Sequence, residues 1–324
     1  MVTTDRHSGW RKRWKSFLSW FDTSALDVSE RPGDRNIDWL RTVPFIGMHV
    51  ACLGVIWVGW SPVAVTTAVA LYLVRMFAIT GFYHRYFSHR SFKTSRITQF
   101  VFAVIGASSV QRGPSWWAAH HRQHHAATEQ ENDPHSPVQH GLLWSHTAWF
   151  LTRESFPIQE KRVRDLQSFP ELRFLDRFDI VVPFLLALAL LMTGIALERF
   201  APQFGTNGAQ MLVWGFFVST VALYHGTFTI NSLAHRWGRR RYNTADNSRN
   251  NFWLALLTLG EGWHNNHHHY PAAAKQGFYW WELDITYYLL KAMSALGLVW
   301  DLKPVPVERR ESNRLKPLRR KYSK

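Results

Sequence analysis

Histidine is the residue type in this sequence that is best placed for chemistry. Of 324 residues, 17 are histidines, and nine of these fall in four short motifs. The motifs are HRYFSH at 84–89, HRQHH at 121–125, NSLAH at 231–235 and GEGWHNNHH at 260–268. Clustered imidazoles repel one another as cations and each need a partner as neutral rings. Shared metal ions are therefore the simplest common explanation.

The spacing within the motifs fits metal binding. On an α-helix, positions i, i+3 and i+4 share a face, so HRQHH and HNNHH can each present three imidazoles to one side. Asn231 and His235 also share a face. His84 and His89 diverge by about 140° on an α-helix, so they either reach two different metals or lie where the helix ends.

The number and type of these ligands favour one class of metal. Nine imidazoles exceed a tetrahedral zinc site, and nitrogen ligation with open positions suits a redox-active metal such as iron, divided between two ions. The single cysteine, Cys52, excludes thiolate iron–sulfur ligation. Three carboxylates near the motifs, Glu261, Asp246 and Asp133, are candidates to orient the imidazoles, although each could equally be a surface acid.

Isolated histidines need a different interpretation. A lone histidine near a membrane is usually a hydrogen-bonded packing residue, and we expect this for His49, His135, His140, His146 and His225.

Four apolar stretches approach the length that a membrane-spanning helix needs. They cover about 43–60, 63–83, 178–197 and 211–230. Only Ser61 and Pro62 separate the first two, and a short loop from Pro202 to Gly208 joins the second pair, so we predict two helical hairpins. The shorter apolar stretches at 97–110 and 252–260 are predicted to be interfacial or buried helices.

Two hairpins return the chain to one side, which places the N-terminal segment, residues 84–177 and the chain after 231 in one compartment. The net charge is +15, and basic residues cluster before the first span, whereas the opposite loops hold only Arg199. By the positive-inside rule the shared compartment is the cytoplasm. The basic residues before the first span are Arg6, Arg11, Lys12, Arg13, Lys15, Arg31, Arg35 and Arg41.

The predicted fold class is therefore an all-α integral membrane protein with four transmembrane helices and a cytoplasmic helical cap that holds a histidine-rich di-iron site. Residues 1–42 form a cytoplasmic segment, 43–304 the membrane domain and 305–324 a basic tail, either close to the membrane or solvated. Because the basic residues accompany the spans, we expect a membrane surface as the partner and no nucleic acid.

The four motifs, in this order, resemble those of the integral-membrane fatty acid desaturases, in particular the stearoyl-CoA Δ9 type, from about residue 43 to 304. The resemblance implies an O2-dependent di-iron enzyme that introduces a cis double bond at Δ9 of a saturated acyl-CoA in unsaturated fatty acid biosynthesis, in a bacterial inner membrane. It implies two Fe2+ ions, bound by His84, His89, His121, His124, His125, His235, His264, His267 and His268, with Asn231 reaching one metal through a water.

The resemblance also implies a bent tunnel for the acyl chain at Gln111, Trp117 and Thr227. Tyr224 and His225 lie about 9 to 10 Å deeper than Asn231 along a helix, so both are candidates for chain-length control. Ala119 and His120 replace the Arg and Asp that precede HRxHH in animal members. This departure leaves the acyl carrier open between CoA, a carrier protein and a membrane phospholipid.

The electron source is expected to be a separate protein, because the chain has no GxGxxG and no cysteine set. A ferredoxin, a cytochrome b5-like protein or a reductase would dock near Arg239, Arg240 and Arg241, which alternatively contact lipid head groups or substrate phosphates. The competing functions are a membrane di-iron hydroxylase and a metal transporter or sensor. A transporter would place ligands near the bilayer midplane, whereas these histidines follow the span ends.

Overall fold

The computed structural model describes residue 10 and residues 14–15, 17–25 and 33–315. Arg6, Arg11, Lys12, Arg13 and Arg31 lie outside the described residues. The helices are α2 (Trp39–Cys52), α3 (Val55–Val58), α4 (Pro62–Phe77), α5 (Arg96–Ala107), α6 (Pro114–Ala126), α7 (Pro137–His140), α8 (Arg164–Gln167), α9 (Pro170–Arg177), α10 (Val181–Phe200), α11 (Gly208–Gln210), α12 (Ser219–Ser232), α13 (Phe252–Leu257), α14 (His264–His269), α15 (Ile285–Ala295) and α16 (Val307–Glu311).

Short segments of other geometry complete the described fold. The π-helices are η2 (Ala78–Ser88), η3 (Trp144–Ala148) and η7 (Met211–Val218). The 3-10 helices are η1 (Thr23–Ala25), η4 (Trp149–Leu151), η5 (Glu160–Arg162), η6 (Pro202–Phe204) and η8 (Leu233–His235). Two short strands, β1 (Lys93–Thr94) and β2 (Val299–Trp300), pair antiparallel.

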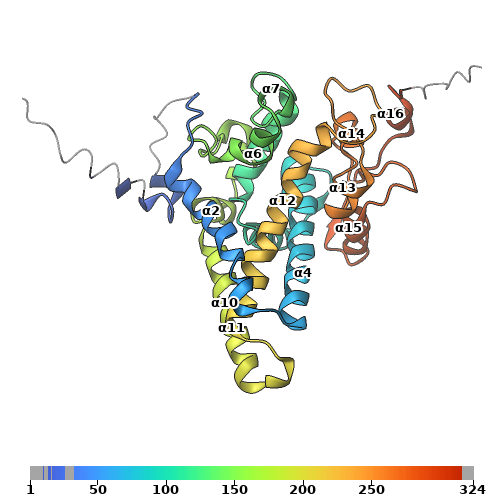
Figure 1. The fold of residues 1–324 in the computed structure, drawn as a ribbon. Helices are drawn as coiled ribbons and strands as arrows, with labels where there is room; N and C mark the ends of the chain where they lie inside the picture. Colours follow the sequence, from blue (N-terminus) through green and yellow to red (C-terminus); the bar gives the residue numbers. More distant parts are fainter. Residues whose placement is uncertain (1–9, 11–13, 16, 26–32, 316–324) are drawn as a thin grey trace, which may run out of the picture.

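Four continuous helical stretches are long and apolar enough to cross a membrane. They are Arg41–Val58, Pro62–Ser88, Val181–Phe200 and Gly208–His235. They run side by side below a cap of shorter helices (Figure 1). The predicted class, a helical membrane protein with two hairpins and a histidine-rich cap, is confirmed.

The second and fourth stretches are longer than the sequence pattern predicts. At 27 and 28 residues they extend roughly 40 Å, which exceeds a hydrocarbon core of about 30 Å. Their last turns therefore leave the membrane and enter the cap, and they carry His84 and His235 with them.

The two hairpin turns contact each other at the end away from the cap. Ser61 caps α4 by accepting from the Ala64 amide, and its hydroxyl also donates to the Thr206 hydroxyl at 3.0 Å. The Trp214 indole donates to the Gly59 carbonyl at 2.9 Å. One of these hydrogen bonds joins the two turns and the other joins η7 to the first turn, so together they tie the hairpins into one bundle.

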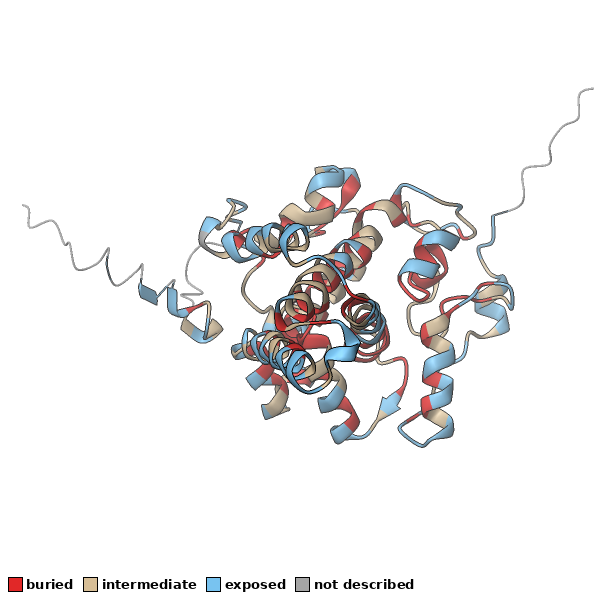
Figure 2. Cartoon of the chain, turned by 60° about the horizontal axis from the view of Figure 1, so that its bottom comes forward, coloured by how far each residue is buried: buried red, intermediate tan, exposed pale blue. Residues whose placement is uncertain are grey.

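The surfaces of the long helices are apolar as well as exposed. Ile56, Trp57 and Phe184 are between 64% and 77% exposed, and buried residues gather where the helices meet (Figure 2). Apolar residues face lipid in such a protein, so this exposure fits a bilayer around the bundle.

The two shorter apolar stretches form helices, as predicted. In α5, the Ala103 carbonyl accepts a hydrogen bond from Tyr83, while Ile97 is 78% exposed. In α13, Phe252 and Trp253 are exposed. Each helix thus packs one face on the protein and presents an apolar face outward.

The described part of the predicted basic tail packs against the cap. The Tyr242 hydroxyl donates to the Arg310 carbonyl at 2.8 Å, and a ring nitrogen of His269 lies 2.7 Å from the Arg309 carbonyl. These contacts hold α16 against the cap, so the packed part of the chain extends beyond residue 304.

Gly194 on α10 lies close to the backbone at the start of the last membrane helix, and this leads to a stability prediction. A Cβ atom added there would lie 2.5 Å from the Asn207 carbonyl oxygen and 2.6 Å from the Gly208 Cα. Because backbone must shift, we expect Gly194→Ala to cost about 1–3 kcal/mol and to lower the thermal midpoint in detergent. The matched control is Gly47→Ala on α2, where nothing lies within 4 Å. Equal midpoints for the two variants would contradict this packing.

Candidate metal centre

The end of the second membrane helix changes from α- to π-helical geometry just where the first histidine motif begins. Residues Ala78–Ser88 form η2, and the His89 amide donates to the His84 carbonyl at 3.3 Å. In a π-helix the hydrogen bonds join residues five apart, so such residues lie on one face. The prediction that His84 and His89 reach different metals is therefore wrong, and the alternative, a position at the helix end, is confirmed for His89.

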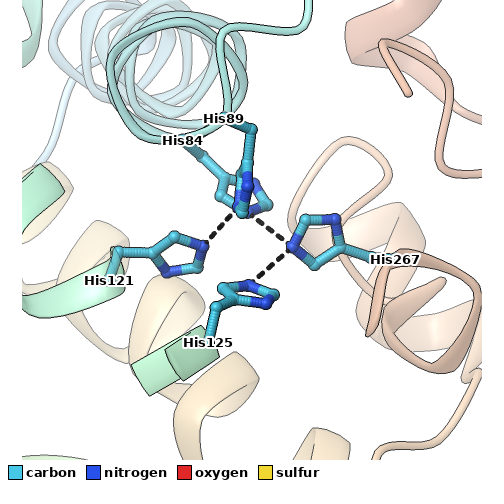
Figure 3. A group of neighbouring side chains, drawn as sticks. All are labelled: His84, His89, His121, His125 and His267. Atoms are coloured by element: carbon cyan, nitrogen blue, oxygen red, sulfur yellow. Dashed lines mark hydrogen bonds between the residues drawn. The ribbon is translucent and has the colours of Figure 1, made fainter. Parts of the chain in front are cut away.

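Five histidines from three segments form a first group, called here group 1. His84 and His89 come from η2 and its end, two come from α6 and one from α14, and all five rings point to a common centre (Figure 3). Their Nε2 atoms lie 2.8–3.0 Å apart in the pairs His89–His121, His125–His267 and His84–His267.

Four histidines form a second group beside it, group 2, which consists of His124, His235, His264 and His268. The Nε2 atoms of His235 and His264 lie 3.1 Å apart. Both α6 and α14 contribute to both groups. On α6, His121 and His125 belong to group 1 and His124 belongs to group 2. On α14, His267 belongs to group 1, whereas His264 and His268 belong to group 2. Neither motif presents three imidazoles to a single group.

Carboxylates near the motifs fix the orientation of three of these imidazoles. The Nδ1 atoms of His124 and His268 lie 3.0 Å and 2.7 Å from oxygens of Asp133 and Asp246. The Nδ1 atom of His84 contacts Glu261. The three carboxylates predicted from the sequence thus all contact histidines of the two groups. Because a carboxylate can only accept here, each Nδ1 carries the proton and each Nε2 keeps a lone pair.

Two further polar residues of the centre were missed. Glu129 accepts from Nδ1 of His235 at 3.0 Å and also binds Asn247. The Gln276 amide donates to Glu261 at 2.9 Å. Glu129 lies only four residues after HRQHH, which is a usable signal, whereas Gln276 has no motif around it and is brought in only by the fold of the cap.

Burial sets the protonation of the centre. It lowers the pKa of His89, His121, His125, His264 and His267 well below the ordinary value, and neighbouring histidines add to this. Burial also lowers the pKa of His268, to about 4. For Asp133 and Asp246 burial raises the pKa, but attraction to and hydrogen bonding with their histidines outweigh it and leave it below the usual range. Near neutral pH these imidazoles are neutral ligands and these carboxylates are charged.

The donor set fits bound metal ions. In group 2, Nε2 of His124 and Nε2 of His268 are buried and have no hydrogen-bond partner among the described residues. Two nitrogens at about 2.1 Å from one ion and at right angles are roughly 3.0 Å apart, which is the separation of the facing Nε2 atoms. Where both nitrogens keep a lone pair, the two repel each other at such distances, and a shared cation removes this repulsion.

A cavity of about 460 Å³ leads to this centre. The three predicted tunnel residues all line it, and the Gln111 amide donates to the Thr227 hydroxyl at 3.0 Å. Trp117 stacks on His121 with ring centroids 5.1 Å apart. A smaller cavity of about 50 Å³ touches both histidine groups, Trp117, Thr227 and Asn231. The predicted tunnel residues thus lie between the metal centre and an apolar cavity.

Of the two residues predicted to lie at tunnel depth, only Tyr224 lines the larger cavity. His225 is exposed, because neighbouring residues on a helix point about 100° apart. Its ring nitrogens lie 3.1 Å from Nε2 of His49 and 3.0 Å from Nε2 of His146. These three isolated histidines are hydrogen-bonded packing residues, as predicted.

His120 and one of the predicted docking arginines, Arg241, are both engaged in contacts within the protein. His120 is buried in the cavity wall, between the rings of Trp116 and Trp149. Arg241 forms an ion pair with the buried Glu282 and stacks over Tyr279. The guanidinium of Arg241 is therefore engaged inside the cap. Of the three predicted docking arginines, only Arg239 is exposed.

Comparison with known proteins adds independent evidence. The family model described as "Fatty acid desaturase" matches residues 59–301. The chain belongs to the fatty acid desaturase family. The match includes all four histidine motifs, so the family's oxidoreductase class and its place in lipid metabolism extend to the chain.

Three relatives show the range of this family. A palmitoyl-monogalactosyldiacylglycerol delta-7 desaturase of Arabidopsis thaliana is 38% identical over 74% of the chain, which spans 62% of that relative. An acyl-CoA 5-desaturase of Anemone leveillei is 35% identical over 88% of each chain. An sn-1 stearoyl-lipid 9-desaturase of Anabaena variabilis is 34% identical over 86% of the chain and 97% of the relative. The relatives' names thus differ in double-bond position and in acyl carrier.

The carboxylate contacts lead to a prediction on metal affinity. Asp246 accepts from His268 with one oxygen and from the Ser248 amide with the other. In Asp246→Asn one of these acceptors becomes a donor, so we expect about 10- to 100-fold weaker metal binding. Competition with a chelator measures this. Asp301→Asn, at an exposed ion pair with Lys93, is the matched control, and equal affinity in both variants would contradict the role of Asp246.

Proposed function

We propose that the protein is an O2-dependent di-iron desaturase that introduces a cis double bond at Δ9 into a saturated fatty acyl chain. The observation that carries this proposal is that an apolar cavity reaches His121 of group 1, next to a smaller cavity that touches both histidine groups. A methylene C–H bond resists every side-chain acid or base, and the iron ions held by groups 1 and 2 would supply the oxidation of that bond by O2.

The chain's own residues hold and shape the substrate in this proposal. The hydrogen-bonded pair Gln111 and Thr227, together with Trp117, forms the bend that presents one carbon pair to the histidine groups. Asn231 lines both cavities and would reach one metal through a water. The apolar walls exclude bulk water and so limit side reactions.

The overall reaction balances with an external donor. The acyl chain gives up two hydrogen atoms, that is two protons and two electrons, a partner protein supplies two more electrons, and two protons are taken up. One O2 becomes two waters. The donor would be a ferredoxin, a cytochrome b5-like protein or a reductase, and exposed Arg239 remains available for its docking.

The proposal also covers location and carrier. By the positive-inside rule the cap and both termini face the cytoplasm, in a bacterial inner membrane. The sequence resemblance favours acyl-CoA as the carrier, but relatives of similar identity are named for acyl-CoA and for acyl-lipids.

The test is expression in a host that lacks Δ9 activity, together with compatible electron carriers. The fatty acids are then profiled by mass spectrometry with location of the double bond. A new cis-9 monoene supports the proposal. Hydroxylated chains would move the assignment to a hydroxylase, and a double bond elsewhere would overturn the Δ9 position alone.

A further inference from the structure

The cavity opens at the level where two membrane helices begin. Its lining includes Arg41, the first residue of one candidate span, and Asp179, which lies just before another. Of the described residues that line it, the exposed ones are Pro44 on α2 and Ile180 and Phe184 at the start of α10. All three are apolar, so the opening faces the lipid between α2 and α10.

The rim of this opening is polar but balanced in charge. The guanidinium groups of Arg41 and Arg112 stack on the ring of Phe156, 3.5 Å and 3.6 Å from its centroid. Arg41 pairs with Asp38 at 3.1 Å, and Arg112 pairs with Asp179 at 2.9 Å. Each of the two arginines among the described residues that line the cavity therefore has its own carboxylate.

We propose that this opening admits the acyl chain of an intact membrane glycerolipid, sideways from the bilayer. Because the rim lies where two candidate spans begin, we expect it at the level of the lipid's ester groups, which are uncharged and accept hydrogen bonds. Coenzyme A carries several phosphate charges, and the paired arginines of the rim offer it no excess positive charge. The inference rests on the proposed desaturase function and names the carrier for that same cavity.

The burial of His120 agrees with a lipid-linked substrate. The animal acyl-CoA members that the sequence resembles have a charged pair before HRxHH, on the polar surface where the thioester head group docks. Here His120 is 3% exposed and lies within the cavity wall. That docking surface is therefore not reproduced by this segment.

The experiment uses the purified, iron-loaded full chain in vesicles of 1-stearoyl-2-oleoyl-phosphatidylglycerol, with a ferredoxin and its reductase and no CoA or acyltransferase. The stearoyl chain carries deuterium, and a second preparation uses the positional isomer with the deuterated stearoyl chain at sn-2 and oleoyl at sn-1. We expect labelled monoene within the intact lipid, formed at least tenfold faster than from deuterated stearoyl-CoA in unlabelled vesicles. Faster conversion of stearoyl-CoA would overturn the inference and leave the desaturase function intact. Failure with both substrates would overturn both proposals.

A pair of variants tests the route. Ile180→Trp narrows the opening, whereas Leu185→Trp changes a lipid-facing residue of α10 that is 55% exposed and does not line the cavity. At equal iron content, we expect Ile180→Trp to slow conversion of the lipid at least tenfold and Leu185→Trp to change it less than twofold. Equal rates for the two variants would overturn the sideways entry.

Discussion

Replacing His124 by alanine is expected to remove one of two metal ions and to lower desaturation by at least about 100-fold. His124 is 2% exposed, and its unpartnered Nε2 belongs to group 2. Its loss removes one of four imidazoles and the side-chain hydrogen bond that the buried Asp133 accepts from His124. The five histidines of group 1 are untouched. We therefore expect one iron per chain in place of two, measured by elemental analysis beside the fatty acid profile.

The matched control for this variant is His140→Ala. His140 belongs to neither histidine group and packs against Trp144 in the cap, with ring centroids 5.5 Å apart. It should retain two irons and parental activity. If His124→Ala retains both irons and the parental product, the division of the nine histidines into two ligand groups is wrong.

Replacing Ala187 by phenylalanine is expected to shift the preferred substrate from stearoyl to palmitoyl chains. Ala187 on α10 lines the cavity about 10 Å below Ile180, together with Met48 and Phe216. A phenyl ring there shortens the space for the methyl end of the chain. A stearoyl chain has two more methylenes than a palmitoyl chain, and each methylene that can no longer be buried costs about 0.8 kcal/mol. We therefore expect the ratio of the stearoyl rate to the palmitoyl rate to fall at least tenfold. Competition between labelled chains measures the ratio.

Ala189→Phe controls for the added ring in the same helix. Ala189 is exposed on α10 and does not line the cavity, so the ratio should stay within twofold of the parental value. A change of the same size in both variants would place the end of the acyl chain elsewhere.

The sequence was sufficient for the fold class because its signals are strong and local. Four apolar stretches and four motifs fix the spans and bring nine histidines to one end of the bundle. The division into groups was not predictable, because it depends on the π-helical turn before His89 and on which histidines of α6 and α14 the fold brings together. Helix geometry at that level is set by packing around the centre.

Partners of the metal-binding histidines were predictable only where they lie near a motif. Asp133, Asp246 and Glu261 satisfy this, and Glu129 could have been included on the same ground. Gln276 and the rim residue Phe156 reach their places through loops of the cap that carry no periodic pattern. Depth along α12 alone predicts His225 as a tunnel residue. Its side chain instead points toward His49 and His146, because direction around a helix cannot be inferred from depth.

A single turnover tests the central claim most directly. The purified protein would be loaded with iron and reduced in the absence of oxygen. After removal of the reductant, it would be mixed with O2 and a labelled saturated acyl substrate. Two Fe2+ ions supply two electrons and the substrate supplies two, which together reduce one O2 to water. The account predicts two irons per chain and about one cis double bond per two irons. A hydroxylated chain, or full iron content without any oxidised product, would contradict it.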